Sequence, residues 1–355
     1  MSFSGIDLAM MRRALALAEH GLYTATPNPR VGCVVASGER VIAEGWHERA
    51  GAPHAEASAL AAAGALAKGA TAYVTLEPCN HHGRTPPCAE ALVRAGVSRV
   101  VAAVKDPNPG SLNGGDALRQ AGVRFEVGLM EDEARELNIG FFSRMARHRP
   151  WVRLKVAATL DGRTALADGR SQWITGAEAR KDGHRWRARA CAVLTGIGTV
   201  RADDPRLTVR EVQTPRQPLR VIVDSRLEIA AQAKVLEGGN ALVFTGAPPK
   251  RELPAEVIAL PNANGKVELP AMLEELARRG VNELHVEAGF RLNGSLVREG
   301  CVDEFLVYLN PSFLGDGAQG MLDLPAFDAL EKRPMLKLRS VERLGGDLRI
   351  LARPA

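Results

Sequence analysis

The chain has 355 residues, of which 46% are hydrophobic, 25% charged and 5% aromatic, and its formal net charge is +5. This length predicts two domains, and the ordinary composition excludes a fibrous or a disordered chain. Because basic residues are interspersed with acidic ones, the positive charge favours nucleic-acid binding only weakly and fits small phosphorylated substrates equally well, so we expect no nucleic-acid partner. No run of about 18 apolar residues and no secretory signal is seen, so we expect no membrane span.

The number of cysteines indicates the cellular compartment in which the protein works. An odd count of five in a chain of this length does not make a disulfide framework and predicts a reducing cytoplasm. Cys33, Cys191 and Cys301 lie in apolar or glycine-rich runs, which is typical of small core residues. Cys79 and Cys88 remain as candidates for metal binding.

Strands and helices alternate along the first part of the chain. After a helix through residue 18, strands are predicted at 31–36, 41–45, 72–76, 99–104 and 124–127. Helices are predicted between most of them, and this alternation favours an α/β layered domain with a central sheet. The basic, aromatic stretch 138–150 ends at a proline and is interpreted as the boundary between domains 1–147 and 148–355.

A second strand–helix series follows the boundary. Strands are predicted at 151–158, 191–194, 219–223, 241–245, 283–286 and 304–309. The clearest helix of the series is the amphipathic run 270–279. A second, separate α/β domain is therefore expected.

Four residues of the first domain have the pattern of a zinc site. His54 and Glu56 open a predicted helix, Cys79 follows an apolar strand, and Cys88 begins the next helix. A catalytic zinc ion takes three protein ligands and leaves a fourth position to water. His54, Cys79 and Cys88 supply that count, and Glu56 is left to move protons, which is the arrangement of zinc-dependent nucleobase deaminases. Chance placement of a histidine and two thiols is the simpler alternative, and a structural zinc closed by His81 or His82 is the stronger one.

This set of residues predicts a hydrolytic reaction. A bound zinc ion lowers the pKa of its water toward neutrality, and the activated water attacks a ring carbon that bears an amine. Glu56 would take the proton of the water and deliver it to the ring nitrogen and then to the amine. Ammonia would leave, and a ring carbonyl would remain.

Longer motifs carry a resemblance to a known family. The segment 77–88, EPCNHHGRTPPC, resembles the P-C-x-H-x-G-[RK]-T-P-P-C loop of the bifunctional deaminase–reductases of riboflavin biosynthesis. Further agreement is found at 26–32, 105–109, 159–163, 171–175 and 202–208, so that the resemblance covers essentially the whole chain.

The resemblance implies fold, activity and cofactors. It implies an N-terminal cytidine-deaminase-like three-layer domain and a C-terminal dihydrofolate-reductase-like domain. The first would use Zn²⁺ to deaminate 2,5-diamino-6-(5-phosphoribosylamino)pyrimidin-4(3H)-one, and the second would use NADPH to reduce the ribosyl group to ribityl. We expect a cytoplasmic homo-oligomer.

The resemblance also implies the site residues. The deaminase substrate contacts would be Asn28, His47 and Arg84, where a loop arginine suits a phosphate. The reductase substrate contacts would be Ser171, Arg187, Leu207, Arg210 and Glu287. The nucleotide contacts would be Ala158, Trp173, Thr199, Asp203, Ser225, Gly289, Phe290, Arg291, Leu292, Asn293, Gly294 and Ser295. Asp203 is the acidic residue expected to position the sugar or to share in catalytic proton movement.

Two departures keep other readings open. The turn at 196–198 lacks G-x-G-x-x-G, so by itself it is more typical of a plain loop than of a nucleotide-binding turn. The family commonly has Glu-Gly-Gly where this chain has Glu287-Ala288-Gly289, and a methyl group on Ala288 would hinder the nucleotide if that residue needed a positive φ. The alternatives are a tRNA or nucleoside deaminase with an appended domain, and a binding module with structural zinc.

Overall fold

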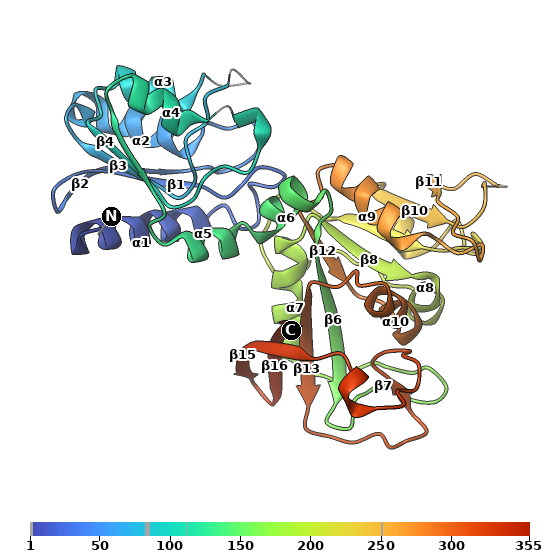
Figure 1. Ribbon diagram of the computed structural model, residues 1–355. Helices are drawn as coiled ribbons and strands as arrows, with labels where there is room; N and C mark the ends of the chain where they lie inside the picture. Colours follow the sequence, from blue (N-terminus) through green and yellow to red (C-terminus); the bar gives the residue numbers. More distant parts are fainter. Residues whose placement is uncertain (1–2, 82–85, 112, 250) are drawn as a thin grey trace. The chain divides into compact units, whose positions relative to one another are not determined.

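The structure, a computed structural model, describes residues 3–81, 86–111, 113–249 and 251–355. The chain divides into two compact units, Met1–Arg147 and His148–Ala355. Both units combine a β-sheet with helices (Figure 1). Within the described ranges, none of the helices is long and apolar enough to cross a lipid bilayer.

The first unit is built around a five-stranded sheet. Its strands are β1 (Gly32–Ser37), β2 (Arg40–Trp46), β3 (Thr71–Val74), β4 (Arg99–Ala102) and β5 (Arg124–Val127). Its helices are α1 (Gly5–Glu19), α2 (Ala55–Ala63), α3 (Cys88–Arg94), α4 (Gly114–Gln120), α5 (Glu131–Leu137) and α6 (Ile139–Arg147), with 3-10 helices η1 (Gly64–Ala67) and η2 (Pro109–Ser111). The strand order is β2-β1-β3-β4-β5, in which β1 is antiparallel to its neighbours and β3, β4 and β5 are parallel. Figure 1 shows α2, α3 and α4 on one face and α1 and α5 on the other.

One buried carboxylate ties the start of this unit to its sheet. Ser4 and Asp7 form a capping box at α1, with the Asp7 N–H donating to Ser4 Oγ over 3.1 Å and the Ser4 N–H donating to Asp7 over 2.9 Å. The Asp7 carboxylate also accepts from the Tyr73 hydroxyl, on β3, over 2.8 Å. Arg99, on β4, donates to it over 2.6 Å. Helix α1 is therefore fixed to two strands through a single side chain.

The second unit is built around a nine-stranded sheet. Its larger strands are β6 (Trp151–Thr159), β8 (Ala192–Gly196), β9 (Leu219–Val223), β10 (Ala241–Thr245), β11 (Glu256–Ala259), β12 (Glu283–Val286), β13 (Glu304–Asn310), β15 (Leu336–Leu344) and β16 (Asp347–Pro354). The short strands β7 (Arg163–Ala165) and β14 (Gln319–Gly320) form a separate pair. The helices are α7 (Ala177–Arg189), α8 (Ile197–Asp203), α9 (Leu269–Arg278) and α10 (Phe290–Arg298), with 3-10 helices η3 (Lys234–Leu236) and η4 (Leu330–Lys332).

The order of this sheet brings several loops together. The strands lie in the order β11-β10-β9-β8-β12-β6-β13-β16-β15. Those from β11 to β13 are parallel, and β16 is antiparallel to both of its neighbours. Because β9, β8, β12 and β6 are parallel neighbours, the segments that follow them meet at one edge of the sheet. Ligands bind at this edge in open α/β sheets.

The predicted strands are found, with shifts of a few residues at their ends. The division between the two units lies within the stretch 138–150, and residues 139–147 of this stretch form helix α6. Phe141, on this helix, is only 5% exposed and belongs to the hydrophobic core of the first unit. The buried aromatic side of α6 therefore fixes the end of the first unit to its core.

Candidate active sites

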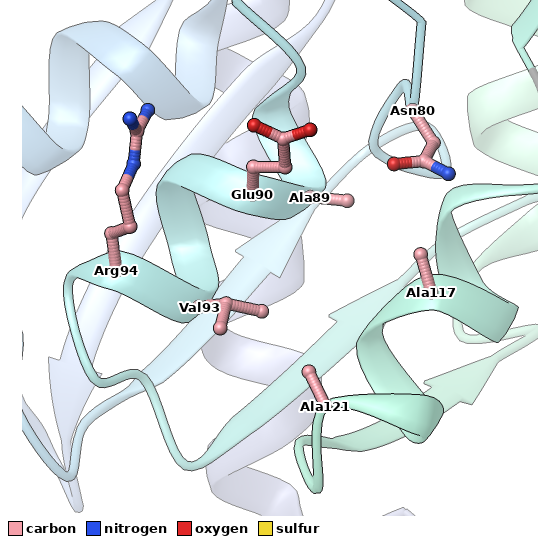
Figure 2. Close-up of a pocket in the computed structure, with 7 residues that line it drawn as sticks. All are labelled: Asn80, Ala89, Glu90, Val93, Arg94, Ala117 and Ala121. Atoms are coloured by element: carbon pink, nitrogen blue, oxygen red, sulfur yellow. The ribbon is translucent and has the colours of Figure 1, made fainter.

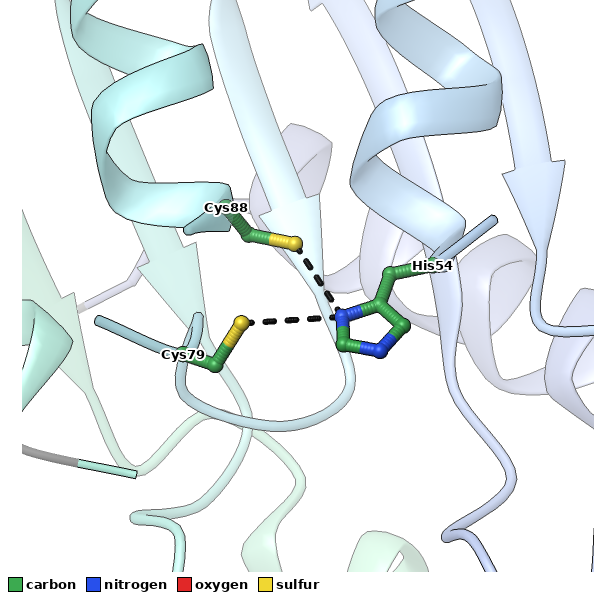
Figure 3. Close-up of side chains that lie close together, drawn as sticks. All are labelled: His54, Cys79 and Cys88. Carbon is green, nitrogen blue, oxygen red and sulfur yellow. Dashed lines mark hydrogen bonds between the residues drawn. The ribbon is translucent and has the colours of Figure 1, made fainter. Parts of the chain in front are cut away.

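Three candidate metal ligands converge in the first unit. His54 precedes α2 as its N-cap, Cys79 lies in the loop after β3, and Cys88 is the first residue of α3. His54 Nδ1 lies 3.5 Å from Cys79 Sγ and 3.3 Å from Cys88 Sγ, and the three ligand atoms lie within 4.8 Å of one another. Figure 3 shows the two sulfurs and the imidazole pointing toward one place. One nitrogen and two sulfurs are donors that zinc prefers, and a set of three leaves a position open for water.

Two glycines allow the segments that carry these ligands to approach. A β-carbon on Gly45, in β2, would lie 2.5 Å from the carbonyl oxygen of Ala55 in the first turn of α2. A β-carbon on Gly114, at the start of α4, would lie 1.8 Å from the carbonyl oxygen of Pro78. Both contacts are with backbone, so a larger residue would displace α2 or the cysteine loop.

A buried carboxyl group lies beside the ligands. Glu56, in the first turn of α2, is 4% exposed. Burial raises the pKa of Glu56 to about 7, against the opposing effects of its own backbone hydrogen bond and of His54. A hydrogen bond from Cys88 lowers the pKa of the neighbouring Cys79 thiol, which favours the thiolate that a metal requires. A carboxyl group that titrates near neutral pH can both take and give protons.

His47 and Asn28 form a pair next to the ligands. The rings of His47 and His54 meet edge to face, with centroids 5.4 Å apart. His47 Nδ1 lies 3.0 Å from the Pro53 carbonyl oxygen, which can only accept, so Nδ1 carries the proton. Burial lowers the pKa of His47, and its neutral Nε2 accepts from Asn28 Nδ2 over 3.0 Å. The structure thus brings two of the predicted deaminase substrate residues to the metal site.

A structural zinc ion would need a fourth ligand from the loop between the two cysteines. Arg84, predicted to bind the substrate, and His82, a possible fourth ligand, both lie outside the described residues. His81 is described and does not belong to the group of side chains that converge on the metal position. Within the described ranges, the ligand set is therefore His54, Cys79 and Cys88.

Asp106 is a further titratable group near this site, and it is absent from the predicted site residues. Burial raises the pKa of Asp106 to about 6, and the negative charges of Glu77 and Cys79 add to the effect. Its Oδ1 accepts the Asn108 N–H over 2.9 Å, and Glu77 accepts the Asp106 N–H over 3.3 Å. The signal in the sequence is the motif at 105–109, which the resemblance already includes.

A separate hollow of about 270 Å³ lies between α3 and α4. Figure 2 shows Glu90 and Arg94 on α3, and the small side chains of Ala117, on α4, and Ala121, directly after α4. Asn80, next to Cys79, also lines it. Its lining is mainly apolar, and the metal ligands themselves are not part of it.

The second unit gathers the predicted nucleotide residues at its sheet edge. Thr199 lies in α8, directly after β8, and Gly289 is the N-cap of α10, directly after β12. A β-carbon on Gly289 would lie 3.6 Å from Thr199 Oγ1, so the two segments meet. Ser225 follows β9, where its hydroxyl accepts the Val267 N–H over 3.1 Å, and Ala158 is buried near the end of β6. An exposed glycine at the start of a nine-residue helix fits the phosphate of a dinucleotide.

Only some of residues 288–295 are accessible to a nucleotide, and the others are buried within the unit. Ala288 is not among the residues with positive φ, and Gly289 has φ −77°, so the Glu-Ala-Gly variant causes no backbone strain here. Asn293 is buried, and its Nδ2 donates to the Ala288 carbonyl over 3.1 Å. A β-carbon on Gly294 would lie 2.2 Å from the carbonyl oxygen of Asp323, so this glycine faces a neighbouring segment of the chain. The more accessible positions of the set are Gly289, Phe290, Arg291, Leu292 and Ser295.

The predicted reductase substrate residues form a charged cluster. Arg187, on α7, makes a two-point ion pair with Glu287, in which Arg187 Nη2 lies 2.9 Å from Glu287 Oε2. Arg187 Nη1 also donates to the carbonyl of Thr208 over 3.1 Å, and Arg210 Nη1 donates to the hydroxyl of Thr208 over 3.2 Å. Leu207, beside them, is buried and has φ 52°. Two guanidinium groups held at one threonine suit a phosphate group.

Two members of this cluster are absent from the sequence predictions. Burial lowers the pKa of Lys155, on β6, and the charges of Glu287 and Arg187 act on it. His184 Nδ1 accepts the backbone N–H of Arg210 over 3.3 Å. Burial, together with the positive charges of Arg187 and Arg210, lowers the pKa of His184 to about 4, so it is neutral near pH 7. Neither residue lies in a recognisable motif, because only the fold brings them to the arginines.

Asp203 contacts a different segment, the loop that contains Gln172. It ends α8, and its Oδ1 accepts from Gln172 Nε2 over 3.2 Å. The neighbours of Gln172 are Ser171 and Trp173, and Trp173 is 70% exposed with the Arg180 guanidinium 4.8 Å from its ring centroid. Burial raises the pKa of Asp203. The structure thus ties Asp203 to the loop that carries two other predicted contacts.

Known proteins resemble the chain along its whole length. Residues 5–104 match the family described as the cytidine and deoxycytidylate deaminase zinc-binding region, and residues 150–350 match the RibD C-terminal domain. The riboflavin biosynthesis protein RibD of Escherichia coli strain K12 is 44% identical over 358 residues, which cover 96% of this chain and 98% of that protein. A structure of Acinetobacter baumannii RibD has a TM-score of 0.92 at 42% identity and covers 99% of both chains. A structure from Thermotoga maritima, described as a diaminohydroxyphosphoribosylaminopyrimidine deaminase/5-amino-6-(5-phosphoribosylamino)uracil reductase, has a TM-score of 0.90 at 34% identity and covers 99% of both chains.

The fold and the two sites define a zinc-binding deaminase domain joined to a separate reductase domain. The chain belongs to the RibD family of riboflavin biosynthesis proteins. It is therefore a bifunctional enzyme of riboflavin biosynthesis that uses Zn²⁺ and NADPH. The predicted fold class is confirmed, with a cytidine-deaminase-like and a dihydrofolate-reductase-like domain.

Proposed function

We propose that the first unit, 1–147, deaminates 2,5-diamino-6-(5-phosphoribosylamino)pyrimidin-4(3H)-one, and that the second unit, 148–355, reduces the ribosyl group of the product to ribityl. The observation that carries the deaminase assignment is the convergence of His54, Cys79 and Cys88 beside the buried carboxyl of Glu56. The substrate follows from the relatives, whose described activities name this pyrimidine and its deaminated product.

In the first unit, each residue has a distinct task. His54, Cys79 and Cys88 would hold zinc, which supplies an activated water when bound. Glu56 would take a proton and return it to the ring nitrogen and to the leaving amine, for which a pKa of about 7 is suited. Asn28, held by His47, would orient the ring edge, and Arg84 would bind the phosphate. Water and the amine are exchanged for a carbonyl and ammonia.

In the second unit, the residues orient substrate and cofactor for a reduction. Thr199, Ser225 and the start of α10 would hold NADPH, which supplies a hydride when bound. Arg187 and Arg210 would bind the substrate phosphate. Reduction adds the hydride to the ribosyl C1′, breaks its bond to the ring oxygen and places a proton on that oxygen.

Two residues are candidates for handling this proton or the groups around it. Lys155 is a half-buried ammonium with a lowered pKa on which the charge of Glu287 acts, so we assign it the proton. Asp203 would position the sugar or the nicotinamide from the loop side. Lys155→Met should lower the reductase kcat with little change in the KM for NADPH, whereas Asp203→Asn should raise that KM. The reverse pattern, in steady-state kinetics on the deaminated substrate, would exchange the two roles.

A cytoplasmic location and a small-molecule substrate complete the proposal. All five cysteines are free thiols, and two of them would have to remain thiolates to bind metal. The substrate is proposed to be a phosphorylated pyrimidine and not a nucleic acid, because aromatic residues for stacking are scarce.

A two-stage incubation tests the whole proposal. The zinc-loaded protein is mixed with the diaminopyrimidine phosphate, first without and then with NADPH. Ammonia should appear in the first stage without any cofactor, and NADPH absorbance should fall only in the second. Consumption of NADPH by the undeaminated substrate, or ammonia release that requires NADPH, would refute the assigned order and division of labour.

A further inference from the structure

Asn138 is a buried polar residue that has no task in either reaction. It is the C-cap of α5, directly before α6, and is only 2% exposed. Its side chain contacts the backbone of Arg30, 108 residues earlier in the chain. The Arg30 N–H donates to Asn138 Oδ1 over 2.8 Å, and Asn138 Nδ2 donates to the Arg30 carbonyl oxygen over 2.8 Å. One side chain therefore binds both backbone groups of one distant residue.

These two hydrogen bonds replace the contacts that a neighbouring strand would make. Strand β1 begins at Gly32, and its ladder with β2 begins at the Gly32–Trp46 pair, so Arg30 lies before the ladder. A carboxamide has the same donor and acceptor as a peptide group, and the two bonds match one hydrogen-bonded pair of an antiparallel ladder. Because Arg30 is 5% exposed, loss of the carboxamide would leave its N–H and carbonyl buried without these partners, which is unfavourable.

The side of the contact that contains Asn138 is itself fixed. The Asn138 N–H donates to the Ala134 carbonyl of α5 over 3.3 Å, and the Phe142 N–H of α6 donates to the Asn138 carbonyl over 3.0 Å. Arg30 Nη1 adds a third bond at this place, to the Leu137 carbonyl, over 2.8 Å. Two helices therefore hold Asn138, and Asn138 holds Arg30.

The position of Arg30 is transmitted to Asn28 through Pro29. The proline ring fixes its own φ and restricts the residue before it. The Asn28 N–H donates to the Ala25 carbonyl over 3.0 Å, which fixes the start of this turn. With both ends held and a stiff residue between them, the Asn28 side chain projects from a nearly rigid backbone.

His47 depends on the same segment. Its backbone N–H donates to the carbonyl of Val31, the residue after Arg30, over 2.9 Å. Its Nε2 lies 3.0 Å from Asn28 Nδ2. One member of the Asn28–His47 pair therefore belongs to segment 28–31 and the other is bonded to that segment, so a shift of Arg30 would move both.

We propose that Asn138 is a positioning residue of the deaminase, which sets the Asn28–His47 pair against the substrate ring by fixing the backbone of Arg30. This inference rests on the proposed function, in which Asn28 orients the ring edge. The metal ligands and Glu56 lie on other segments. A contact that the substrate makes equally before and during the reaction changes KM and leaves kcat nearly unchanged. Loss of the Asn138 carboxamide should therefore act mainly on KM.

Kinetics of ammonia release by the zinc-loaded full-length protein test this role. Asn138→Ala should raise the KM for the diaminopyrimidine phosphate about tenfold and change kcat less than about threefold, since one lost hydrogen bond is worth up to about a factor of ten. The zinc content and the reductase kinetics should stay unchanged. Asn138→Asp, which keeps the acceptor for the Arg30 N–H and loses the donor, should raise KM at least about threefold. A wild-type KM in folded N138A, or in N138D if N138A does not fold, would overturn the proposal.

General weakening of the first unit is controlled with Asp7→Asn. The Asp7 carboxylate accepts from Tyr73 and Arg99, on β3 and β4, so its loss weakens the unit through other contacts. At a temperature at which both variants are fully folded, D7N should keep the wild-type KM for deamination. An equal rise in KM in D7N and N138A would reduce Asn138 to a structural residue and contradict the positioning role.

A double-mutant cycle with Asn28→Ala tests the path of the effect. Asn28→Ala alone should raise the deaminase KM, and N28A/N138A should raise it less than about twofold further, because residues that act through one contact are not additive. Multiplication of the two effects would show that Asn138 does not act through Asn28. An unchanged KM in N28A would refute the proposed ring contact, and the inference with it. A raised KM in N28A with an unchanged KM in N138A would refute the positioning role alone.

Discussion

The two active sites are built in different ways. In the first unit, His54, Cys79 and Cys88 meet at one point, and each contributes an atom whose chemistry is recognisable from residue type alone. In the second unit, the site is spread along the ends of four parallel strands, and its central feature is the Arg187–Glu287 ion pair among further cations. Loss of one side-chain atom should therefore nearly abolish the activity of the first site. Single substitutions in the second site should lower its activity by smaller steps.

The most decisive change is Glu56→Gln. Removing the carboxylate to which we assign proton transfer should lower the rate of ammonia release by about 10²–10⁴-fold, because general acid–base catalysis contributes about that much. The zinc content and the reduction of already deaminated substrate should stay unchanged. Glu133→Gln, an exposed glutamate on α5, is the control. If the Glu56 variant also lost its zinc or its reductase activity, the two sites would not be independent in the way described.

Charge balance in the second unit is tested by Arg153→Met. Arg153 is 2% exposed and lies 2.6 Å from Glu304 and 3.2 Å from Glu283. Its removal should reduce the free energy of unfolding by about 3 kcal/mol, the lower end for a broken buried pair, because other arginines still contact both carboxylates. Urea denaturation measures the loss.

The control for Arg153 is Arg170→Met, which breaks an exposed pair with Asp168. This change should cost less than about 1 kcal/mol. If both variants lost the same free energy of unfolding, burial of the Arg153 ion pairs would contribute nothing to the stability of the second unit.

Acid should weaken the first unit through Asp7. Burial alone would raise the pKa of Asp7, but hydrogen bonds from Arg99, Ser4 and Tyr73 outweigh it and hold the pKa well below its usual value. A lowered carboxyl pKa gives stability that is fully present above the unfolded pKa of about 4 and is lost as the pH falls through the folded value.

Asp7→Asn should therefore cost about 2 kcal/mol at pH 7, and the difference from the wild type should shrink as the pH falls below about 4. Urea denaturation at pH 7, 5 and 3 measures both proteins under the same conditions, so that acid-induced loss of zinc affects them alike. A difference that stays constant with pH would remove the ionised carboxylate from the explanation.

The smallest expected effect concerns His184, a positioning residue. His184→Ala removes the acceptor of the Arg210 N–H and should raise the reductase KM for the deaminated substrate about fivefold, with kcat nearly unchanged. His184→Asn, whose Oδ1 can take the place of Nδ1, should restore most of the affinity. A fall in kcat with an unchanged KM, or failure of Asn to rescue, would contradict a role through Arg210.

The sequence predicts the first site better than the second for a physical reason. Metal ligands belong to few residue types and lie at helix starts and strand ends, so the order of residues along the chain is enough to identify His54, Cys79 and Cys88. His184 and Lys155 are ordinary residues of a helix and a strand, and only the parallel sheet brings them to Arg187. The reductase residues are predicted by the resemblance to a family and not by the physical chemistry of the sequence.

The fold shows the same contrast. The parallel strands of both units are short apolar runs between turns, and most are predicted to within a few residues. Helix α6 is not predicted as a helix, because its arginines conceal the buried side that contains Phe141, although the division between the units falls at its end. The hairpin β15–β16 is not predicted, because a strand that is exposed along most of its length alternates leucine and valine with charges and resembles a surface segment.

Gly45 and Gly114 have a consequence for how sequence variation in this enzyme should be interpreted. Neither residue is a ligand or a proton donor, yet each leaves room that a single methyl group would fill. Alanine at either position should lower the affinity for zinc, although every side chain that coordinates the ion is unchanged. An inactive variant with a complete set of ligands can therefore owe its defect to an added carbon atom one layer away from the metal.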